Sequence, residues 1–362
     1  MSGQQGGSCG CGVTRRDVMK GGVALGAGAM LFGAGNLRSA KAQGGHNITF
    51  IQGVIADQFY VTMECGMQAA AAEMGVTLNV QGPTAFDATL QTPILNAVVQ
   101  AQPDGIIMAP NDVQAMIVPI QAAVDAGIPV LCVDTTINSD IQIADVSSDN
   151  IEGGRIAARA LAEAIGGTGK VFVVNVNPGI STTDQREQGF REALEAEFPD
   201  IEYLGQEFSD NDVNRASEIT NARLQSDPDL AGIFGTNLFA AQGAASGVRQ
   251  QGQQGVVRIV GFDAGEVQVQ DLLQENVDIL IAQHPADIGV TGLRLMVEYL
   301  DTQTEPDPNK FLTGYTVVTR ENIEEPDVAR YLYISDCGQY SAPEGTPAVT
   351  AVEAEAAATP NA

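Results

Sequence analysis

The sequence of 362 residues lacks tryptophan altogether and contains only two histidines, five cysteines and 18 basic residues. So few histidines and cysteines exclude a metal cluster of those ligands and leave no histidine placed to activate a serine or cysteine nucleophile. Because 45 acidic residues outnumber the basic ones, the net charge is −27, which argues against nucleic acid or an anionic membrane as a partner. We therefore expect no cofactor, no metal site and no nucleic-acid ligand.

Long hydrophobic runs are also absent, apart from one weakly apolar stretch near the N-terminus. "TRRDVMK" (Thr14–Lys20) carries Arg15 and Arg16, and a Gly/Ala-rich run followed by "RSAKA" comes next. This order is typical of a secretory signal, and paired arginines are typical of the twin-arginine (Tat) pathway. We expect residues 1–42 to be a Tat signal peptide. A membrane anchor is the alternative, but the run has about half of the ~20 apolar residues that a span requires.

Three cysteines follow the predicted signal, an odd number at unrelated spacings. They are Cys65, Cys132 and Cys337. Cys132 lies in the apolar run "IPVLCVD", so we expect it to be a buried thiol. We expect all three to be structural, because only His46 and His284 could join them around a metal.

From Asn47 onward, apolar runs alternate with helical segments in two series of similar length. Helices are expected near 57–74, 89–101 and 112–126, and then near 153–165, 184–197, 214–225, 240–250 and 266–275. Fully apolar strands between helices predict parallel sheets that are covered on both faces. We therefore predict an α/β protein with two doubly wound parallel-sheet lobes.

Polar side chains follow several of the predicted strands where each strand ends. These residues are Asn111, Asp134, Asn237, Asp263 and Gln283. Because open parallel sheets bind ligands beyond the carboxyl ends of their strands, we expect these side chains to face one cleft. For any single residue the alternative is a local helix cap, which also favours Asp and Asn.

The polar set and two aromatic residues suit a polyhydroxylated ligand. Carboxylates accept strong hydrogen bonds from hydroxyl groups, and the aromatic faces of Phe59 and Tyr60 can pack against ring C–H groups. For Phe59 the alternative is core packing on its own helix.

Catalytic motifs are missing from the chain. "GGTGK" (Gly166–Lys170) follows a helix and precedes a strand, which is the reverse of a phosphate-binding loop. Asp134 and Asp263 leave a glycosidase as an alternative, since paired carboxylates can serve as acid and base. Nothing else supports such an enzyme, and we expect a binding protein.

Seven motifs together resemble one family. In chain order they are "DQFYVTMECG", "GIPVLCVD", "VSSDNIEGGRIAA", "QREQGF", "IFGTN", "VVRIVGFD" and "IAQHPADIG". With these motifs, residues 47–333 or so resemble the type I periplasmic sugar-binding proteins of ABC transporters, the ribose-binding-like family. The resemblance implies two α/β lobes joined by a three-stranded hinge, which close on one sugar molecule.

The resemblance also implies the ligand-binding residues. Asp57 falls where the family has a sugar-contacting Asn, and Phe59 and Tyr60 fall on its stacking aromatics. Four further positions match contact residues of the same type, namely Asp134, Asn237, Asp263 and Gln283. Departures occur at Thr135 and Asp184, which stand where the ribose-type pattern has arginines, and at Asn211, which replaces an aromatic residue. Ribose itself is therefore not expected.

A second branch of the family shares other features with this chain. Asp184 and Gln185, in "TTDQ", resemble the Asp-Gln pair of the autoinducer-2 and rhamnose-type branch, and "QGPT" (Gln81–Thr84) resembles another of its motifs. Gly53, however, stands where that branch has a lysine, which argues against autoinducer-2. We expect a sugar or polyol outside both specificities.

Four carboxylates would converge if all of these residues faced the cleft: Asp57, Asp134, Asp184 and Asp263. Several buried carboxylates raise the free energy unless hydrogen bonds or opposite charges compensate. We therefore expect a ligand that is rich in hydroxyl donors or positively charged, or an Arg186 that turns inward. The alternative for Asp184 is that it caps its own helix and does not meet the ligand.

The resemblance predicts how the chain divides. Lobe 1 is expected over 43–149 and 285–312, lobe 2 over 150–284 and 313–337, and a disordered tail over 338–362. The tail is expected because this segment has no periodicity and is rich in Ala, Pro, Thr and Glu. The chain should cross between the lobes near 147–150 and 283–285.

The expected function is that of an extracytoplasmic solute-binding receptor of an ABC importer. It would be a monomer in the periplasm or at the cell surface, capture a sugar or polyol, and deliver it to a membrane permease. The alternative is an autoinducer-2-like or other small-ligand receptor that feeds a sensor or chemotaxis partner. A regulator of the lactose-repressor type shares this core but would need a basic helix-turn-helix at its N-terminus, where an export signal is predicted.

Overall fold

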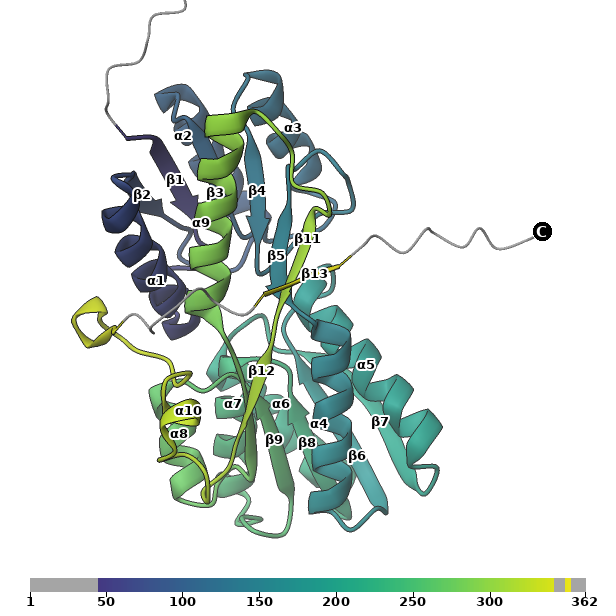
Figure 1. The fold of residues 1–362 in the computed structure, drawn as a ribbon. Helices are drawn as coiled ribbons and strands as arrows, with labels where there is room; N and C mark the ends of the chain where they lie inside the picture. The colour runs from purple at the N-terminus through teal and green to yellow at the C-terminus, as the bar shows by residue number, and fades with distance from the viewer. Residues whose placement is uncertain (1–44, 342–348, 353–362) are drawn as a thin grey trace, which may run out of the picture. The chain divides into compact units, whose positions relative to one another are not determined.

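Two sheets organise the chain. The computed structural model describes residues 45–341 and 349–352 (Figure 1). The first elements are β1 (Asn47–Ile51), α1 (Gln58–Met74), β2 (Thr77–Gln81), α2 (Ala88–Ala101), β3 (Gly105–Met108), α3 (Ile117–Asp125), β4 (Val130–Val133) and β5 (Asp145–Ser148). The next are α4 (Asn150–Ala164), β6 (Gly169–Asn175), α5 (Ser181–Glu197), β7 (Ile201–Phe208), α6 (Val213–Ser226), β8 (Leu230–Gly235), α7 (Leu238–Gln250), β9 (Arg258–Phe262), α8 (Glu266–Leu273) and β10 (Ile279–Gln283). The last are α9 (Pro285–Thr302), β11 (Lys310–Thr313), β12 (Tyr315–Val318), α10 (Pro326–Ala329), the short helix η1 (Cys337–Gln339) and β13 (Val349–Val352).

The strand order of each sheet is that of a doubly wound fold. One sheet has the order β13-β11-β5-β4-β3-β1-β2 and the other β12-β10-β9-β8-β6-β7. Neighbouring strands are parallel, except that β13 on β11 and β12 on β10 are antiparallel. We call the first sheet with α1, α2, α3 and α9 lobe 1, and the second with α4 to α8 lobe 2. The predicted pair of doubly wound lobes is therefore confirmed.

Burial explains why these segments are strands. Every residue of β3 and β4 is buried, as expected for central strands that are covered on both faces. At the edge of the same sheet, β2 alternates between exposed and half-buried residues. Helix boundaries differ from the expected ones by a few residues. The most consequential difference is at α5, which begins at Ser181 rather than near 184.

Three strand connections cross between the lobes and form the hinge. The chain crosses after Ser148 of β5, after Gln283 of β10, and at Gly314 between β11 and β12. Side chains from these crossings meet, because Ser148 Oγ donates to Gln283 Oε1 at 3.0 Å and lies 3.4 Å from Thr313 Oγ1. All three residues are buried, so the crossings are coupled through direct polar contacts.

Beyond β12 the chain returns to lobe 1, which differs from the expected division. Figure 1 shows the yellow segment that follows α10 running from beside α8 to α1. Its end is fixed by a disulfide between Cys337 and Cys65 of α1. Residues around 333–337 therefore contact lobe 1, although the whole of 313–337 was expected in lobe 2. The spacing of these two cysteines in the sequence did not predict the disulfide, because only the fold brings them together. The expected buried thiol of Cys132 is confirmed.

The predicted disordered tail is wrong in part. β13 pairs antiparallel with β11, and η1 is a helical turn. Without β13, β11 would be the sheet edge with unpaired backbone groups, which readily accept another strand. Residues 342–348 and 353–362 of the tail, and the predicted signal, residues 1–42, lie outside the described residues. Among the described helices, none combines the length and the apolar composition of a membrane span.

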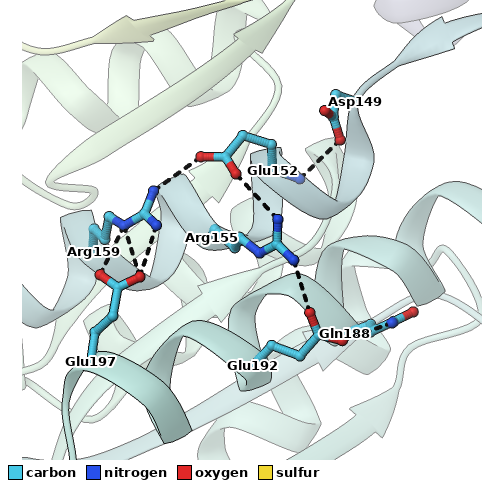
Figure 2. Close-up of polar contacts among 7 residues, drawn as sticks. All are labelled: Asp149, Glu152, Arg155, Arg159, Gln188, Glu192 and Glu197. Carbon is cyan, nitrogen blue, oxygen red and sulfur yellow. Dashed lines mark hydrogen bonds and ion pairs between the residues drawn. The ribbon is translucent and has the colours of Figure 1, made fainter. Parts of the chain in front are cut away.

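Helices α4 and α5 of lobe 2 approach each other closely enough for their backbones to touch. A Cβ atom on Gly154 would lie 2.0 Å from the Arg186 carbonyl oxygen, and one on Gly189 would lie 1.9 Å from the Ile151 carbonyl oxygen. Only glycine permits this approach. Figure 2 shows the outer side of the pair, where Arg155 and Arg159 of α4 reach glutamates of both helices. Exposed ion pairs of this kind stabilise little, so the glycine contact fixes the spacing.

This contact predicts a strong effect of one methyl group. Gly189→Ala should lower the free energy of unfolding by about 1–3 kcal/mol, because the added Cβ overlaps the Ile151 carbonyl. Urea denaturation measures the change. Glu195→Ala, at an exposed position of the same helix, is the control and should change it by less than about 0.5 kcal/mol. Equal stabilities of the two variants would contradict the predicted close packing.

Candidate functional site

A pocket lies between the two lobes, where the carboxyl ends of both sheets meet. The space between its walls is about 390 Å³, and this volume includes a part that is open to solvent. The lining residues are Asp57, Phe59, Tyr60, Phe86, Asp134, Val176, Ile180, Thr182, Thr183, Arg186, Asn211, Asn237, Asp263 and Gln283. Both lobes and the hinge therefore contribute to its wall.

Asp134 and Asp263 occupy equivalent places in the two lobes. Asp134 follows β4 and Asp263 follows β9, and each N–H donates to the adjacent strand at 2.8 Å. Both have left-handed backbones, with φ of 62° and 76°. For a residue other than glycine this conformation costs about 1–2 kcal/mol. Strained backbone conformations are often found at functional sites, where they orient a side chain. Here the left-handed residues lie at the ends of two strands, and their carboxylates line the same pocket.

The carboxylate of Asp263 is held by three donors. Oδ2 accepts from the Leu238 N–H at 2.8 Å, at the start of α7. Oδ1 accepts from Gln283 Nε2 at 2.8 Å and from the Tyr333 hydroxyl at 2.9 Å. The first donor lies at a helix N-terminus, where the helix dipole also favours negative charge. Asp263 is therefore fixed in orientation as well as in place.

Asp57 and Asp134 of lobe 1 have fewer partners. Asp57 caps α1 and accepts from the Phe59 N–H at 2.9 Å. Its burial, followed by the nearby charge of Asp263, raises its pKa from 3.8 to about 7, although the Phe59 N–H opposes the shift. Burial raises the pKa of Asp134 to about 6, while Arg186 and the hydroxyl of Tyr60 lower it. That hydroxyl donates to Asp134 Oδ2 at 2.7 Å, so Tyr60 contributes a polar contact as well as an aromatic face.

Arg186 is the cation among the described residues that line the pocket. Nε donates to Asn150 Oδ1 at 2.9 Å and Nη1 to the Thr236 carbonyl at 2.8 Å. The guanidinium carbon also lies 4.1 Å from the ring centroid of Phe262. The expected inward turn of Arg186 is therefore present, and the close packing of α4 on α5 sets its position. One guanidinium faces three carboxylates, so the wall keeps an excess of acceptors.

The first turn of α5 adds hydroxyl groups to the wall. Thr182 and Thr183 are buried and line the pocket. Among the described atoms, Thr183 Oγ1 has no hydrogen-bond partner, although it is buried. Buried hydroxyls are nearly always satisfied in folded proteins, so this oxygen is available to a bound molecule. On the other side of the pocket, Asn237 caps α7 and donates to Asn211 Oδ1 at 2.7 Å.

Most of the predicted site residues meet at this pocket. They are Asp57, Phe59, Tyr60, Asp134, Asn211, Asn237, Asp263 and Gln283. Phe59 lines the pocket and also belongs to the core of lobe 1, which was the alternative for this residue.

Three predicted site residues, and one strand-end residue, do not line the pocket. The Asp184 carboxylate accepts from the Gly179 N–H at 2.8 Å, which keeps it at the start of its own helix. Thr135 and Gln185 line a separate cavity beside the hinge. Asn111 donates to the Gly53 carbonyl at 2.9 Å and supports a loop. In each case the side chain points toward its own lobe or the hinge. The sequence gives the type of a residue but not the direction of its side chain.

Several lining residues were not predicted from the sequence. Phe86, Val176 and Ile180 lie in connections without a distinctive motif, and Thr182 and Thr183 were assigned to a segment before the expected helix. Thr182 and Thr183 could have been predicted if the helix had been expected to begin at Ser181, because its first turn then lies at the pocket. In the described part of the chain, no group of three His, Cys, Asp or Glu side chains is placed to hold a metal ion.

Comparisons with known proteins agree on one kind of molecule. Residues 48–304 match the family described as periplasmic binding protein domain. An ABC-transporter solute-binding protein from Agrobacterium vitis, solved with α-D-tagatopyranose, is 44% identical and superposes with a TM-score of 0.78 over 80% of this chain and 99% of its own. A second protein of that organism, solved with D-fucose, is 26% identical, with a TM-score of 0.75 over 79% of this chain and 100% of its own. The D-ribose/D-allose-binding protein of Pseudomonas aeruginosa is 27% identical over 71% of this chain and 83% of its own.

The buried carboxyl of Asp57 predicts a pH-dependent stability. Because its folded pKa of about 7 exceeds the ordinary value of 3.8, the folded state binds more protons between these values, and the free energy of unfolding falls as pH rises through this window. From pH 5 to pH 8 the unliganded protein should lose roughly 2–3 kcal/mol through Asp57. Asp57→Asn should remove this part of the loss, while the smaller part due to Asp134, whose pKa is also raised, should remain. Asp200→Asn, at an exposed position, should retain the whole loss. Urea denaturation at both pH values measures the difference, and parallel curves for wild type and Asp57→Asn would contradict it.

Proposed function

The chain belongs to the periplasmic binding protein family, among the solute-binding proteins of ABC transporters, and on that premise we propose that it captures a monosaccharide between its two lobes. One observation carries the proposal, namely the convergence of Asp57, Asp134 and Asp263 with Arg186 in a pocket that aromatic side chains also line. Carboxylates accept hydrogen bonds from sugar hydroxyls, and the guanidinium donates to hydroxyl or ring oxygens.

A neutral polyhydroxylated ligand fits the charge of this wall best. Its hydroxyl groups donate to carboxylates that otherwise face one another in a poorly solvated space. Phe59 and Phe86 supply apolar faces for ring C–H groups. The relative solved with α-D-tagatopyranose makes a ketohexose in the pyranose form the first candidate. The proposed site residues are therefore those that line the pocket, without Thr135, Asp184 and Gln185.

Closure of the lobes would trap the ligand. Across the cleft, the Glu266 N–H of α8 donates to Gln58 Oε1 of α1 at 2.9 Å, and the Thr136 N–H donates to Ser181 Oγ at 3.0 Å. Leu238 of lobe 2 also packs in the core of lobe 1. These contacts exist only while the lobes touch. A ligand that binds both lobes would stabilise this closed form, which then presents its surface to the permease.

We propose no catalytic role for these carboxylates. A general acid or base must be able to exchange a proton with the reacting bond. The carboxylate oxygens of Asp263 already accept from three donors, and Asp134 accepts from the Tyr60 hydroxyl, so these oxygens are engaged within the protein. The receptor is expected to act as a monomer and, given its charge, without a nucleic-acid partner.

The proposal is tested by thermal unfolding of the purified protein against tagatose, fructose, other hexoses, pentoses and sugar alcohols. A sugar at 100 times its dissociation constant should add about 2.7 kcal/mol to stability and raise the midpoint. Asp134→Asn should weaken binding of that sugar by about tenfold or more. Asp184→Asn, the matched control outside the pocket, should bind as the wild type does. If no sugar shifts the midpoint, or if both variants bind equally, the proposed site is refuted.

We also propose that residues 1–42 direct export by the Tat pathway, since Arg15 and Arg16 precede a short apolar run. Replacing both arginines by lysine should leave the protein in the cytoplasm of its host at unchanged expression, which cell fractionation measures. Replacing Lys20 by arginine is the control and should leave export intact. Normal export of the double-lysine variant would point to the general secretory route instead.

A further inference from the structure

A short segment after α10, residues 331–337, crosses from lobe 2 to lobe 1 in addition to the three hinge crossings. We call it the strap. At its start, Tyr331 and Leu332 pack against the core of lobe 2. At its end, Cys337 is bonded to Cys65, and before it the Ile334 N–H donates to Thr62 Oγ1 at 3.0 Å. Both anchors lie on α1, the helix whose first residues line the pocket.

Tyr333, in the middle of the strap, is 3% exposed and contacts the pocket wall from behind. Its ring meets that of Phe59 edge to face at 5.8 Å between centroids. Its hydroxyl donates to Asp263 Oδ1 at 2.9 Å and accepts from the Gln283 N–H at 3.1 Å. Its own N–H donates to the Ala264 carbonyl at 3.0 Å. Tyr333 thus joins a pocket carboxylate, a pocket aromatic and a hinge residue without lining the pocket itself.

The position of the hydroxyl matters because Asp263 Oδ1 has two donors. Gln283 Nε2 is one of them, and its amide is fixed at the other end by Ser148. The Tyr333 hydroxyl is the second, and it comes from a part of the chain outside both sheets. Without it, one lone pair of a buried carboxylate would be unsatisfied, and the carboxylate could rotate away from the geometry that a ligand hydroxyl needs.

We propose that Tyr333 is a positioning residue for ligand binding and that the Cys65–Cys337 disulfide holds it in place. The proposal rests on the proposed function, because it concerns the carboxylate that would accept a sugar hydroxyl. The strap is fixed at one end by a covalent bond and at the other by core packing. The Tyr333 hydroxyl is therefore held at Asp263 before the ligand binds, and binding does not have to order it. Ligand affinity therefore depends on a disulfide that does not line the pocket.

Tyr333→Phe tests the positioning role. It keeps the ring against Phe59 and removes only the hydroxyl. Isothermal titration with the sugar that binds the wild-type protein, at a temperature where both proteins are fully folded, should show a loss of affinity of about tenfold. The ligand-free unfolding midpoint should also fall, because the Gln283 N–H loses its acceptor. Tyr299→Phe, on α9 and outside the pocket lining, is the matched control and should bind normally. Unchanged affinity in Tyr333→Phe, measured where the variant is fully folded, would overturn the role.

A double-mutant cycle tests the strap. The Cys65→Ser/Cys337→Ser variant should also bind more weakly, and in that background Tyr333→Phe should cost about twofold or less, because the hydroxyl is no longer held at Asp263. Losses that simply multiply would overturn the coupling to the disulfide. Thr62→Val, which removes the other anchor of the strap, provides the same cycle if the cysteine variant does not fold.

The two proposals fail in distinguishable ways. A wild-type protein that binds no sugar of the panel overturns the proposed function, and this inference falls with it. A wild-type protein that binds a sugar while Tyr333→Phe binds it equally well overturns this inference alone.

Discussion

The hydrogen bonds of the Asp263 carboxylate are the interactions on which the arrangement of this molecule depends. Its three donors come from the start of α7, from the end of β10 and from the strap. One belongs to lobe 2, one to the hinge and one to a segment anchored on lobe 1. All three parts must therefore be correctly placed around one side chain. A displacement of any of them removes one of the three donors of a buried carboxylate, which is energetically costly.

The opposite charge reaches the pocket by a different kind of constraint. Arg186 is placed by helix packing, because glycines at 154 and 189 allow α4 and α5 to touch along their backbones. Its bonds to Asn150 and to the Thr236 carbonyl then direct it inward. The carboxylates and the arginine therefore reach the pocket for different structural reasons. The carboxylates lie where strands end, whereas the arginine lies on a helix that can pack closely on its neighbour because two contact positions of the pair are glycines.

The alternation of apolar runs and helical segments made the architecture predictable from sequence. The directions of individual side chains were harder to predict. Strand ends placed Asp134, Asp263 and Gln283 at one edge, and the structure brings these three together. Asp184 shows the limit, because a carboxylate in the first turn of a helix can face a cleft or bond a nearby backbone N–H, and the residue type does not distinguish the two.

Long-range pairings were beyond the reach of sequence patterns. Cys65 and Cys337 are separated by 272 positions, and only the fold brings the strap back to α1. The same is true of β13, since its pairing with β11 depends on an exposed sheet edge that exists only after lobe 1 has formed. Local propensity predicted neither feature, because neither depends on local interactions.

The acidity of the pocket has a consequence for how an empty receptor behaves. Closing the cleft without cargo confines Asp57, Asp134 and Asp263 in a small space with one guanidinium, and their mutual repulsion works against closure. Hydroxyl groups of a bound sugar would relieve that repulsion at the moment the lobes meet. We therefore expect the repulsion among these carboxylates to make closure less favourable without a bound sugar than with one.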